Sequence, residues 1–216
     1  GCYAATPRTF TNPTAQVLEI RNRLFLIDCG EGTQVQLRKN KIKFSKINHV
    51  LISHLHGDHF FGLIGLLSTM NLLGRVKPIQ IYAPKELETI LGLQIEYDGS
   101  RMSYEIEFIT TDPTREVVVM EDDKVKVTSF PLAHKVPTTG FKITQKEKQR
   151  HLLVDKAKSH GVKIEHYHLL KDGIDVVNGE GKEFKSSDYT LPGEGEKSYA
   201  FCSDTKYSEA IIPSIK

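Results

Sequence analysis

The sequence is short of the features that secreted and membrane proteins need. It has three cysteines in 216 residues, Cys2, Cys29 and Cys202, which are odd in number, widely spaced and free of any CxxC pair. This argues against a disulfide framework and favours a reducing compartment. No apolar run approaches the ~18 residues of a membrane-spanning helix, and the first ten residues lack the layout of a signal peptide. We therefore expect a cytoplasmic protein without a membrane segment.

An excess of charge of either sign is also lacking. The 29 Lys and Arg residues against 27 Asp and Glu residues leave a net charge of +2. That balance neither demands nor excludes a polyanionic partner, because local patches matter more than the sum. At ~150 residues per domain, the length predicts one large domain, or one domain with an appendage. Such a chain buries a core without disulfides.

Apolar periodicity predicts an α/β protein. Alternating or continuous apolar runs, typical of strands, occupy residues 15–20, 23–30, 47–53, 78–84, 104–110, 115–120, 125–134 and 139–144. Helical spacing is found in residues 32–40, 59–73 and 85–93. Strands with interleaved helices, followed by more strands, predict sheets covered by helices.

Residues 145–198 differ in character from the rest. They are rich in Gly and charge, and their one helical pattern is "LLVDKAKSHG". We interpret them as an inserted, partly mobile arm rather than core. The predicted division is 1–144 for the first part of the core, 145–198 for the arm, and 199–216 for the return to the core. Cys202 in the last part is expected to be a buried strand residue.

The segment "SHLHGDH", residues 53–59, concentrates metal-binding side chains at a strand-to-helix junction. His54 and His56 lie two apart after a predicted strand, so both imidazoles can face one ion. Asp58 and His59 follow the Gly57 turn and suit a second ion nearby. Nitrogen and carboxylate ligands without thiolate fit zinc, with manganese or iron as alternatives.

The same segment carries the HxHxDH signature of the metallo-β-lactamase fold. Over most of the chain up to residue 205, the sequence resembles ribonuclease Z, the tRNA 3′-processing endonuclease of that superfamily. The segments that carry the resemblance are, in order, "NPTAQVLEI", "FLIDCGEGTQ", "LISHLHGDHFFGLIGLL", "IYAPKEL", "FPLAH" and "FCSDT". The resemblance implies a four-layer αββα sandwich with an inserted arm, acting as a homodimer on precursor tRNA.

The resemblance also implies roles for individual residues. His54, His56 and His134 would hold one zinc ion, Asp58 and His59 a second, and Asp204 would bridge the two. Asp58 would also be catalytic, orienting a zinc-bridging hydroxide that cleaves 3′ of the discriminator nucleotide and leaves a 3′-hydroxyl. Asp28 would either brace the ligand loop by hydrogen bonds or simply cap the turn that follows it.

Two segments of the ribonuclease Z pattern are not found. No HEAT-like segment supplies a histidine to protonate the leaving group, and no late GHS-like segment supplies the last zinc ligand. The strand that normally precedes "GC" is missing as well. We therefore expect this sequence to lack its first strand and a C-terminal part of the sandwich.

The basic residues leave two interpretations open. In the arm, Lys146, Lys148 and Arg150 could contact tRNA phosphates, which would make binding salt-sensitive, or form a solvated charged face. The run Arg38–Lys46 could rim the substrate groove or be an exposed helix end. His166 and His168 in the arm lack a carboxylate or thiolate partner, which favours ordinary polar residues over a metal site.

Two other functions remain open. One is a small-molecule hydrolase on the same scaffold, such as a phosphodiesterase, arylsulfatase or lactonase, for which the arm would be superfluous. The other is a tRNA-binding protein with a degenerate, non-catalytic site, which would bind tRNA without stoichiometric metal.

Overall fold

The computed structural model describes residues 6, 10–97 and 102–216. It divides the chain into two compact units: unit 1 comprises residues 1–143 and 199–216, and unit 2 comprises residues 144–198. Cys2 and most of the first ten residues, on which the signal-peptide argument depends, lie outside the described residues. No helix within the described ranges is long and apolar enough to span a membrane.

The first sheet of unit 1 has five strands in the order β1-β2-β3-β4-β5. Their bounds are β1 Gln16–Ile20, β2 Arg23–Ile27, β3 Ile47–Leu51, β4 Ile79–Ala83 and β5 Ile106–Thr110. β1 and β2, two of the predicted strands, form an antiparallel hairpin that turns at Arg21 and Asn22, both with positive φ. β2 to β5 are all parallel, so their carboxyl ends share one edge of the sheet.

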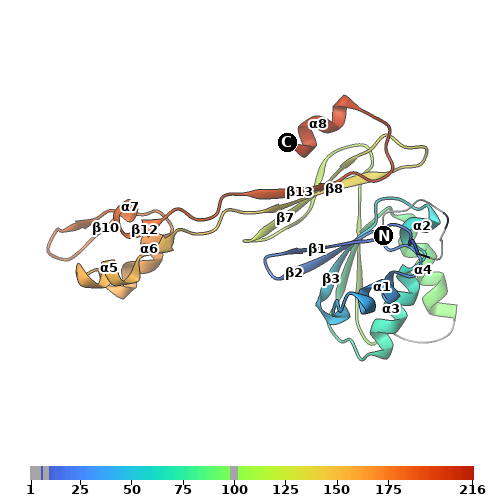
Figure 1. Cartoon of the computed structure of the whole chain (residues 1–216), viewed down its shortest axis with the longest axis horizontal. Helices are drawn as coiled ribbons and strands as arrows, with labels where there is room; N and C mark the ends of the chain where they lie inside the picture. The colour runs from blue at the N-terminus through green and yellow to red at the C-terminus, as the bar shows by residue number, and fades with distance from the viewer. Residues whose placement is uncertain (1–5, 7–9, 98–101) are drawn as a thin grey trace. The chain divides into compact units, whose positions relative to one another are not determined.

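Helices cover the outer face of this sheet (Figure 1). They are α1 Thr33–Lys39, α3 Leu63–Leu72 and α4 Glu86–Tyr97, with a 3-10 turn at Phe44–Lys46. The buried faces of α1, α3 and α4 present Leu37, Leu66 and Leu87 to Val50 of β3 in one core. The predicted helices at 32–40 and 85–93 are therefore confirmed.

The single helix predicted over residues 59–73 is wrong, because the chain forms α2 Gly57–Phe60 and then α3. Two backbone hydrogen bonds explain the break. Cys29 N donates to the carbonyl of His59 (2.7 Å), and Gly62 N donates to the carbonyl of Cys29 (2.9 Å). A Cβ on Gly62 would lie 2.1 Å from the carbonyl oxygen of Gly30. Contact with the turn after β2 therefore replaces the helical ladder at this point.

The second sheet of unit 1 has the order β13-β8-β7-β6. Its strands are β6 Val117–Glu121, β7 Val125–Pro131, β8 Thr139–Gln145 and β13 Lys197–Phe201. Its inner face packs on the first sheet, with Val127 and Phe141 in one core with Phe25 and Tyr82. On its other face, Phe130 and Leu132 pack with Ile211 of the 3-10 turn Glu209–Ile211, which α8 Ile212–Ile215 follows.

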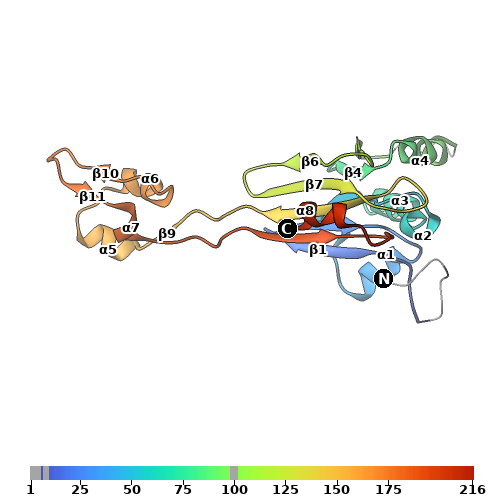
Figure 2. The same cartoon turned by 90° about the horizontal axis from the view of Figure 1, so that it is seen from above.

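Unit 2 is a compact unit with more regular structure than the single helical pattern that the sequence showed. It contains α5 Val154–Ser159, the 3-10 turn Ile164–His166, α6 Tyr167–Lys171 and α7 Ser186–Tyr189. Two short sheets pair β9 His151–Leu152 with β12 Thr190–Leu191, and β10 Val176–Val177 with β11 Glu183–Phe184. Figure 2 labels α5, α6, α7, β9, β10 and β11 of this unit. The elements of the unit enclose a core. Its buried residues are Leu152, Ala157, Val162, Leu170, Val176, Phe184 and Tyr189.

Candidate metal centre

The residues predicted to hold or brace metal in unit 1 lie in loops that follow strands. Asp28 comes directly after β2, and His54 comes three residues after the end of β3, at the same edge of the parallel sheet. His134 follows β7 and Asp204 follows β13 in the second sheet. Since both sheets pack face to face, the loops at these strand ends bring residues far apart in sequence to one place.

Four of the predicted ligands form a first donor group, made of His54, His56, His134 and Asp204. One ligand atom from each lies within 4.8 Å of the others. Among the described residues, these four form a group of metal-capable side chains that are close enough to hold one ion. His56 Nδ1 is 3.0 Å from His54 Nε2 and 3.4 Å from His134 Nε2. Ligand nitrogens of a tetrahedral zinc ion lie about 3.3 Å apart. The donor set and its spacing therefore fit such an ion.

A second donor group is made of Asp58, His59 and the same Asp204. His59 Nε2 lies 3.4 Å from Asp58 Oδ2 and 3.9 Å from Asp204 Oδ2. Asp204 Oδ2 is also 3.9 Å from His134 Nε2 in the first donor group. The carboxylate of Asp204 therefore lies between the two groups, which is where a residue shared by two ions would be.

Asp28 connects the strand end to this cluster. It is fully buried and adopts φ 55, a left-handed conformation that aspartate tolerates better than most residues. Oδ1 accepts a hydrogen bond from Ser53 N (2.8 Å), and Oδ2 lies 2.8 Å from His59 Nδ1. With its Nδ1 proton donated to Asp28, His59 has Nε2 free for a metal ion. Of the two interpretations of Asp28, the contacts match the brace.

The electrostatics of the cluster keep His54 uncharged. Burial, together with the neighbouring imidazoles of His59, His56 and His134, lowers the pKa of His54 to about 3. Burial also lowers the pKa of His59, but the hydrogen bond and charge of Asp28, with Asp58 and Asp204, outweigh it and leave that pKa raised. Burial raises the pKa of Asp28, against the opposing effect of His59. A neutral His54 is the form that coordinates metal.

The sequence did not reveal three hydroxyl side chains that make contacts near the donor groups, those of Ser53, Ser203 and Thr205. Ser53 Oγ lies 3.0 Å from His54 Nδ1 and 3.0 Å from Ser203 Oγ. Thr205 Oγ1 accepts a hydrogen bond from Ala133 N (3.1 Å), beside His134. The only signal in the sequence was adjacency to a predicted ligand, because serine and threonine are common in ordinary turns.

In unit 2, the predicted phosphate-binding residues Lys148 and Arg150 contact other residues of the same unit. Lys148 Nζ pairs with Glu194 (2.7 Å), and Arg150 Nε donates to Thr190 Oγ1 (2.6 Å). Lys146 is half-buried. His166 Nε2 lies 3.8 Å from Glu165. Neither His166 nor His168 belongs to a group of three metal-capable residues in the part of the chain that the structure describes.

The structure favours the exposed helix end for the run Arg38–Lys46 and corrects the expected burial of Cys202. The run Arg38–Lys46 lies between the end of α1 and the start of β3, whose five residues rise roughly 16 Å towards the cluster. It therefore borders the amino ends of the parallel strands and does not rim the metal centre. Cys202 is exposed and follows β13 rather than lying buried within it.

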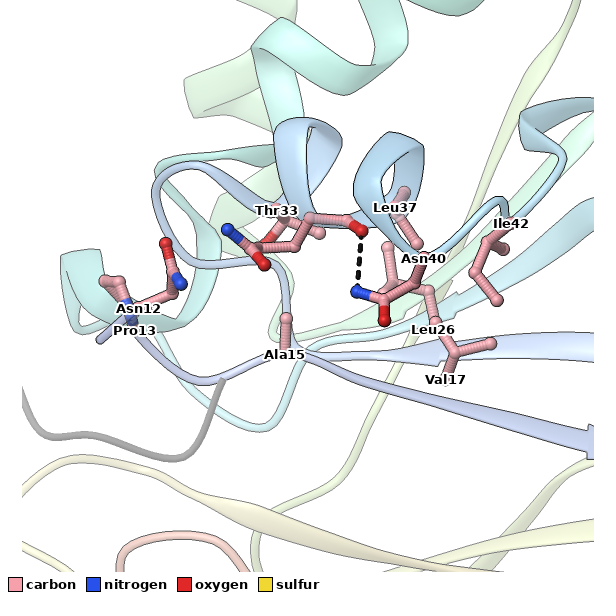
Figure 3. A pocket seen from close by; sticks show the side chains of 10 residues that line it. Asn12, Pro13, Ala15, Val17, Leu26, Thr33, Leu37, Asn40 and Ile42 are labelled. Carbon is pink, nitrogen blue, oxygen red and sulfur yellow. Dashed lines mark hydrogen bonds between the residues drawn. The ribbon is translucent and has the colours of Figure 1, made fainter. Parts of the chain in front are cut away.

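A pocket of about 370 Å³ lies between β1, β2 and α1 (Figure 3). Its walls include Pro13, Val17 and Leu37, and Asn40 Nδ2 donates to the carbonyl of Gln36 (2.9 Å) beside it. None of the metal-capable histidines lines this pocket. We therefore place the chemistry at the donor groups and not in this cavity.

Comparison with known sequences gives two family names. A family model described as "Anti-Pycsar protein Apyc1" matches residues 3–170. Ribonuclease Z of Parabacteroides distasonis is 42% identical over 216 residues, and ribonuclease Z of Bacteroides fragilis is 40% identical over 215 residues. Each alignment covers 100% of this chain and 71% of the relative. The relatives include the Asp204 region, whereas the Apyc1 match ends before it.

Comparison with solved structures also finds a tRNase Z and a protein with the metallo-β-lactamase fold. The crystal structure of human tRNase Z, short form, superimposes with a TM-score of 0.60 and 33% identity, covering 66% of this chain and 61% of that one. The metallo-β-lactamase fold protein YhfI of Bacillus subtilis gives a TM-score of 0.51 at 20% identity, covering 66% of this chain and 56% of that one, which shows the shared fold alone.

Proposed function

Because the chain belongs to the ribonuclease Z family, has the α/β metallo-β-lactamase fold and matches the Apyc1 family model over residues 3–170, we propose that it is a metal-dependent endoribonuclease. It would cleave precursor tRNA on the 3′ side of the discriminator nucleotide and leave a 3′-hydroxyl. The names of the bacterial relatives and of the human structure support an RNA substrate, and in the human case a tRNA.

The observation that carries this proposal is the convergence of both donor groups on Asp204. His54, His56, His134 and Asp204 would hold one ion, and Asp58, His59 and Asp204 another. When bound, such ions supply Lewis acidity and lower the pKa of water so that it can attack a phosphodiester at neutral pH. Paired ions would suit a phosphodiester because a water oxygen attacks phosphorus while a substrate oxygen leaves.

The protein's own side chains prepare the site. Asp28 holds the Nδ1 proton of His59, and Ser53 Oγ lies within hydrogen-bonding distance of His54 Nδ1, so both Nε2 atoms point into the site. Asp58 is half-buried beside His59. We propose that its carboxylate also orients the attacking water by accepting a proton from it.

Zinc is the metal we propose, at two ions per subunit, because the donors are imidazole and carboxylate without thiolate. Manganese and iron accept the same donors. Metal analysis of the full-length protein tests this directly. Close to two zinc ions per chain supports the proposal, whereas tRNA binding without stoichiometric metal would favour a non-catalytic tRNA-binding protein.

We further propose that unit 2 is the tRNA-binding arm and that Lys146, Lys148 and Arg150 contribute charge to it. Recognition through phosphates and helical shape needs no base reading. Lys148 pairs with Glu194 and Arg150 donates to Thr190 within the unit, so each of the three residues is tested by its own alanine variant.

We also propose that the protein acts in the cytoplasm as a homodimer, as the family resemblance implies. Leu72, Leu73 and Val76 at the end of α3 are 85%, 61% and 76% exposed, and a second copy would cover such an apolar surface. Light scattering on the full-length protein, which gives its mass in solution, checks the oligomeric state.

Cleavage of a precursor tRNA, compared with hydrolysis of bis(p-nitrophenyl) phosphate, tests the substrate class. We expect the full-length metal-loaded protein to cut the precursor at one position, and chelation to abolish the cut. Hydrolysis of the ester with no cleavage of precursor tRNA would instead favour the small-molecule phosphodiesterase, and arylsulfate and lactone substrates would complete that comparison.

A further inference from the structure

Ser203 immediately precedes Asp204, the residue that both donor groups share. We propose that Ser203 is a positioning residue, which holds Asp204 in register with the second donor group through its contact with Ser53. The inference rests on the proposed function, since it assumes that both donor groups bind ions. It predicts that loss of the Ser203 hydroxyl, which is not a metal ligand, lowers the affinity for one ion more than the affinity for the other.

Asp204 needs such support because its own surroundings do not fix it. Its side chain is 52% exposed and lies in the loop after β13. Its Oδ2 atom is 3.9 Å from Nε2 of both His59 and His134, which is beyond hydrogen-bonding distance. An exposed carboxylate retains rotamer freedom, and ordering it costs free energy when an ion binds.

The residues on either side of Asp204 are anchored to different sheets. On one side, Thr205 Oγ1 accepts a hydrogen bond from Ala133 N (3.1 Å), and Lys206 N donates to the carbonyl of Ala133 (2.8 Å). These bonds tie the loop to the segment after β7 that carries His134. On the other side, Ser203 Oγ meets Ser53 Oγ at 3.0 Å, at the end of β3 in the first sheet.

Ser53 is a fixed partner for this contact. It is fully buried, its N–H donates to Asp28 Oδ1 (2.8 Å), and its carbonyl accepts from Thr139 N at the start of β8 (2.9 Å). Its hydroxyl has a single proton, so it donates to one neighbour and accepts from the others. Ser203 therefore docks on a residue that contacts Asp28, the brace of His59, and that cannot itself move freely.

The two anchors predict an asymmetric effect. Without the Ser203 hydroxyl, the bonds to Ala133 still keep Asp204 beside His134, and the three imidazoles of the first donor group are untouched. The second donor group depends on the contact between the sheets, and it has only one imidazole, His59, with two carboxylates. Outer contacts of this kind are worth about 10-fold to 100-fold in metal affinity.

The test is stepwise titration of the metal-free, full-length protein with Co²⁺ by absorption spectroscopy, and with Zn²⁺ against a chromophoric chelator. In Ser203→Ala we expect the weaker of the two binding steps to lose about 10-fold to 100-fold in affinity, with little change in the tighter step. Ser203→Thr keeps a hydroxyl and should restore the weaker step. Ser68→Ala, on the exposed face of α3, is the matched control and should behave as the unchanged protein.

The outcomes separate this inference from the proposed function. If the unchanged protein takes up no metal, the proposed function fails and the inference fails with it. If the unchanged protein binds two ions but Ser203→Ala weakens both steps equally, or neither, the inference alone is overturned. Melting curves of the metal-free variants show whether folding has changed, and Ser203→Thr then decides, because a purely structural defect would not follow the hydroxyl.

Discussion

The two compact units hold their candidate functional residues in different ways. In unit 1, residues from four loops converge, and buried partners such as Asp28 and Ser53 fix them. In unit 2, Lys148 and Arg150 are engaged with Glu194 and Thr190 of their own unit. This difference matches the proposed roles, because catalysis requires accurate placement of a few atoms, whereas phosphate binding depends on dispersed charge.

The largest expected effect is that of His56→Ala in unit 1. His56 Nδ1 lies between the other two imidazoles of the first donor group, so its loss removes the centre of that group. We expect metal content to fall and precursor cleavage to drop by more than about 100-fold. Metal analysis and single-turnover cleavage check this together. Retained cleavage with reduced metal would contradict the ligand assignment.

The next largest effect is expected from a variant that unfolds unit 2 and leaves unit 1 folded. Phe184 is 1% exposed in the core of unit 2, and Phe184→Ala removes about 3–5 kcal/mol of stability from a buried aromatic site. We expect unit 2 to unfold while unit 1 still binds metal and still hydrolyses a small phosphodiester.

Cleavage of precursor tRNA should then fall through weaker binding, seen as a raised KM. Leu191→Ala, at a half-exposed apolar side chain of the same unit (52%), is the control and should leave KM nearly unchanged. Loss of metal in the Phe184 variant would contradict the independence of the two units.

A smaller effect is expected for Asp28→Asn, which keeps the size of the side chain but removes its charge. The amide cannot hold the His59 Nδ1 proton as a carboxylate does, so metal affinity and cleavage should each fall about 10-fold to 100-fold. An equilibrium metal titration measures this. If the variant binds metal normally, Asp28 only caps its turn.

The smallest effect is expected for Lys146→Ala in unit 2. It should weaken tRNA binding by a few-fold and lower the salt slope of log K by about 1 for each phosphate that the lysine neutralises, without changing metal content or ester hydrolysis. Binding measured over a range of salt concentrations tests it. Lys124→Ala, an exposed lysine of unit 1, is the control. An unchanged slope would show that Lys146 does not bind a tRNA phosphate.

Much of unit 1 follows from the sequence because its signals are local. The strand positions of the first sheet and the helices α1 and α4 were predicted from alternation and helical spacing, whereas the parallel pairing of β2 to β5 was not predicted. The ligand candidates His54, His56, Asp58 and His59 could be found because such a dense cluster is rare, whereas His134 and Asp204 were predicted from the family resemblance. The break between α2 and α3 was not predictable, since it depends on hydrogen bonds with Cys29, which donates to His59 and accepts from Gly62, and not on the pattern of residues 59–73.

The features that were missed all depend on distant partners. Ser53 and Ser203 are 150 positions apart, and neither residue type signals a contact. The strands of unit 2 are only two residues long, too short for alternation to be recognised. Its core depends on scattered residues such as Leu152 and Phe184, in a segment whose overall composition is polar and charged.

The glycines at 30 and 62 show how little freedom the ligand turn has. A methyl group at Gly30 would lie 2.3 Å from the carbonyl oxygen of Asp58, and one at Gly62 would lie 2.1 Å from the carbonyl oxygen of Gly30. Main chain therefore touches main chain on both sides of the α2 turn. In a saturation library these two positions would accept glycine alone. Any redesign of specificity would therefore have to change loops other than this turn.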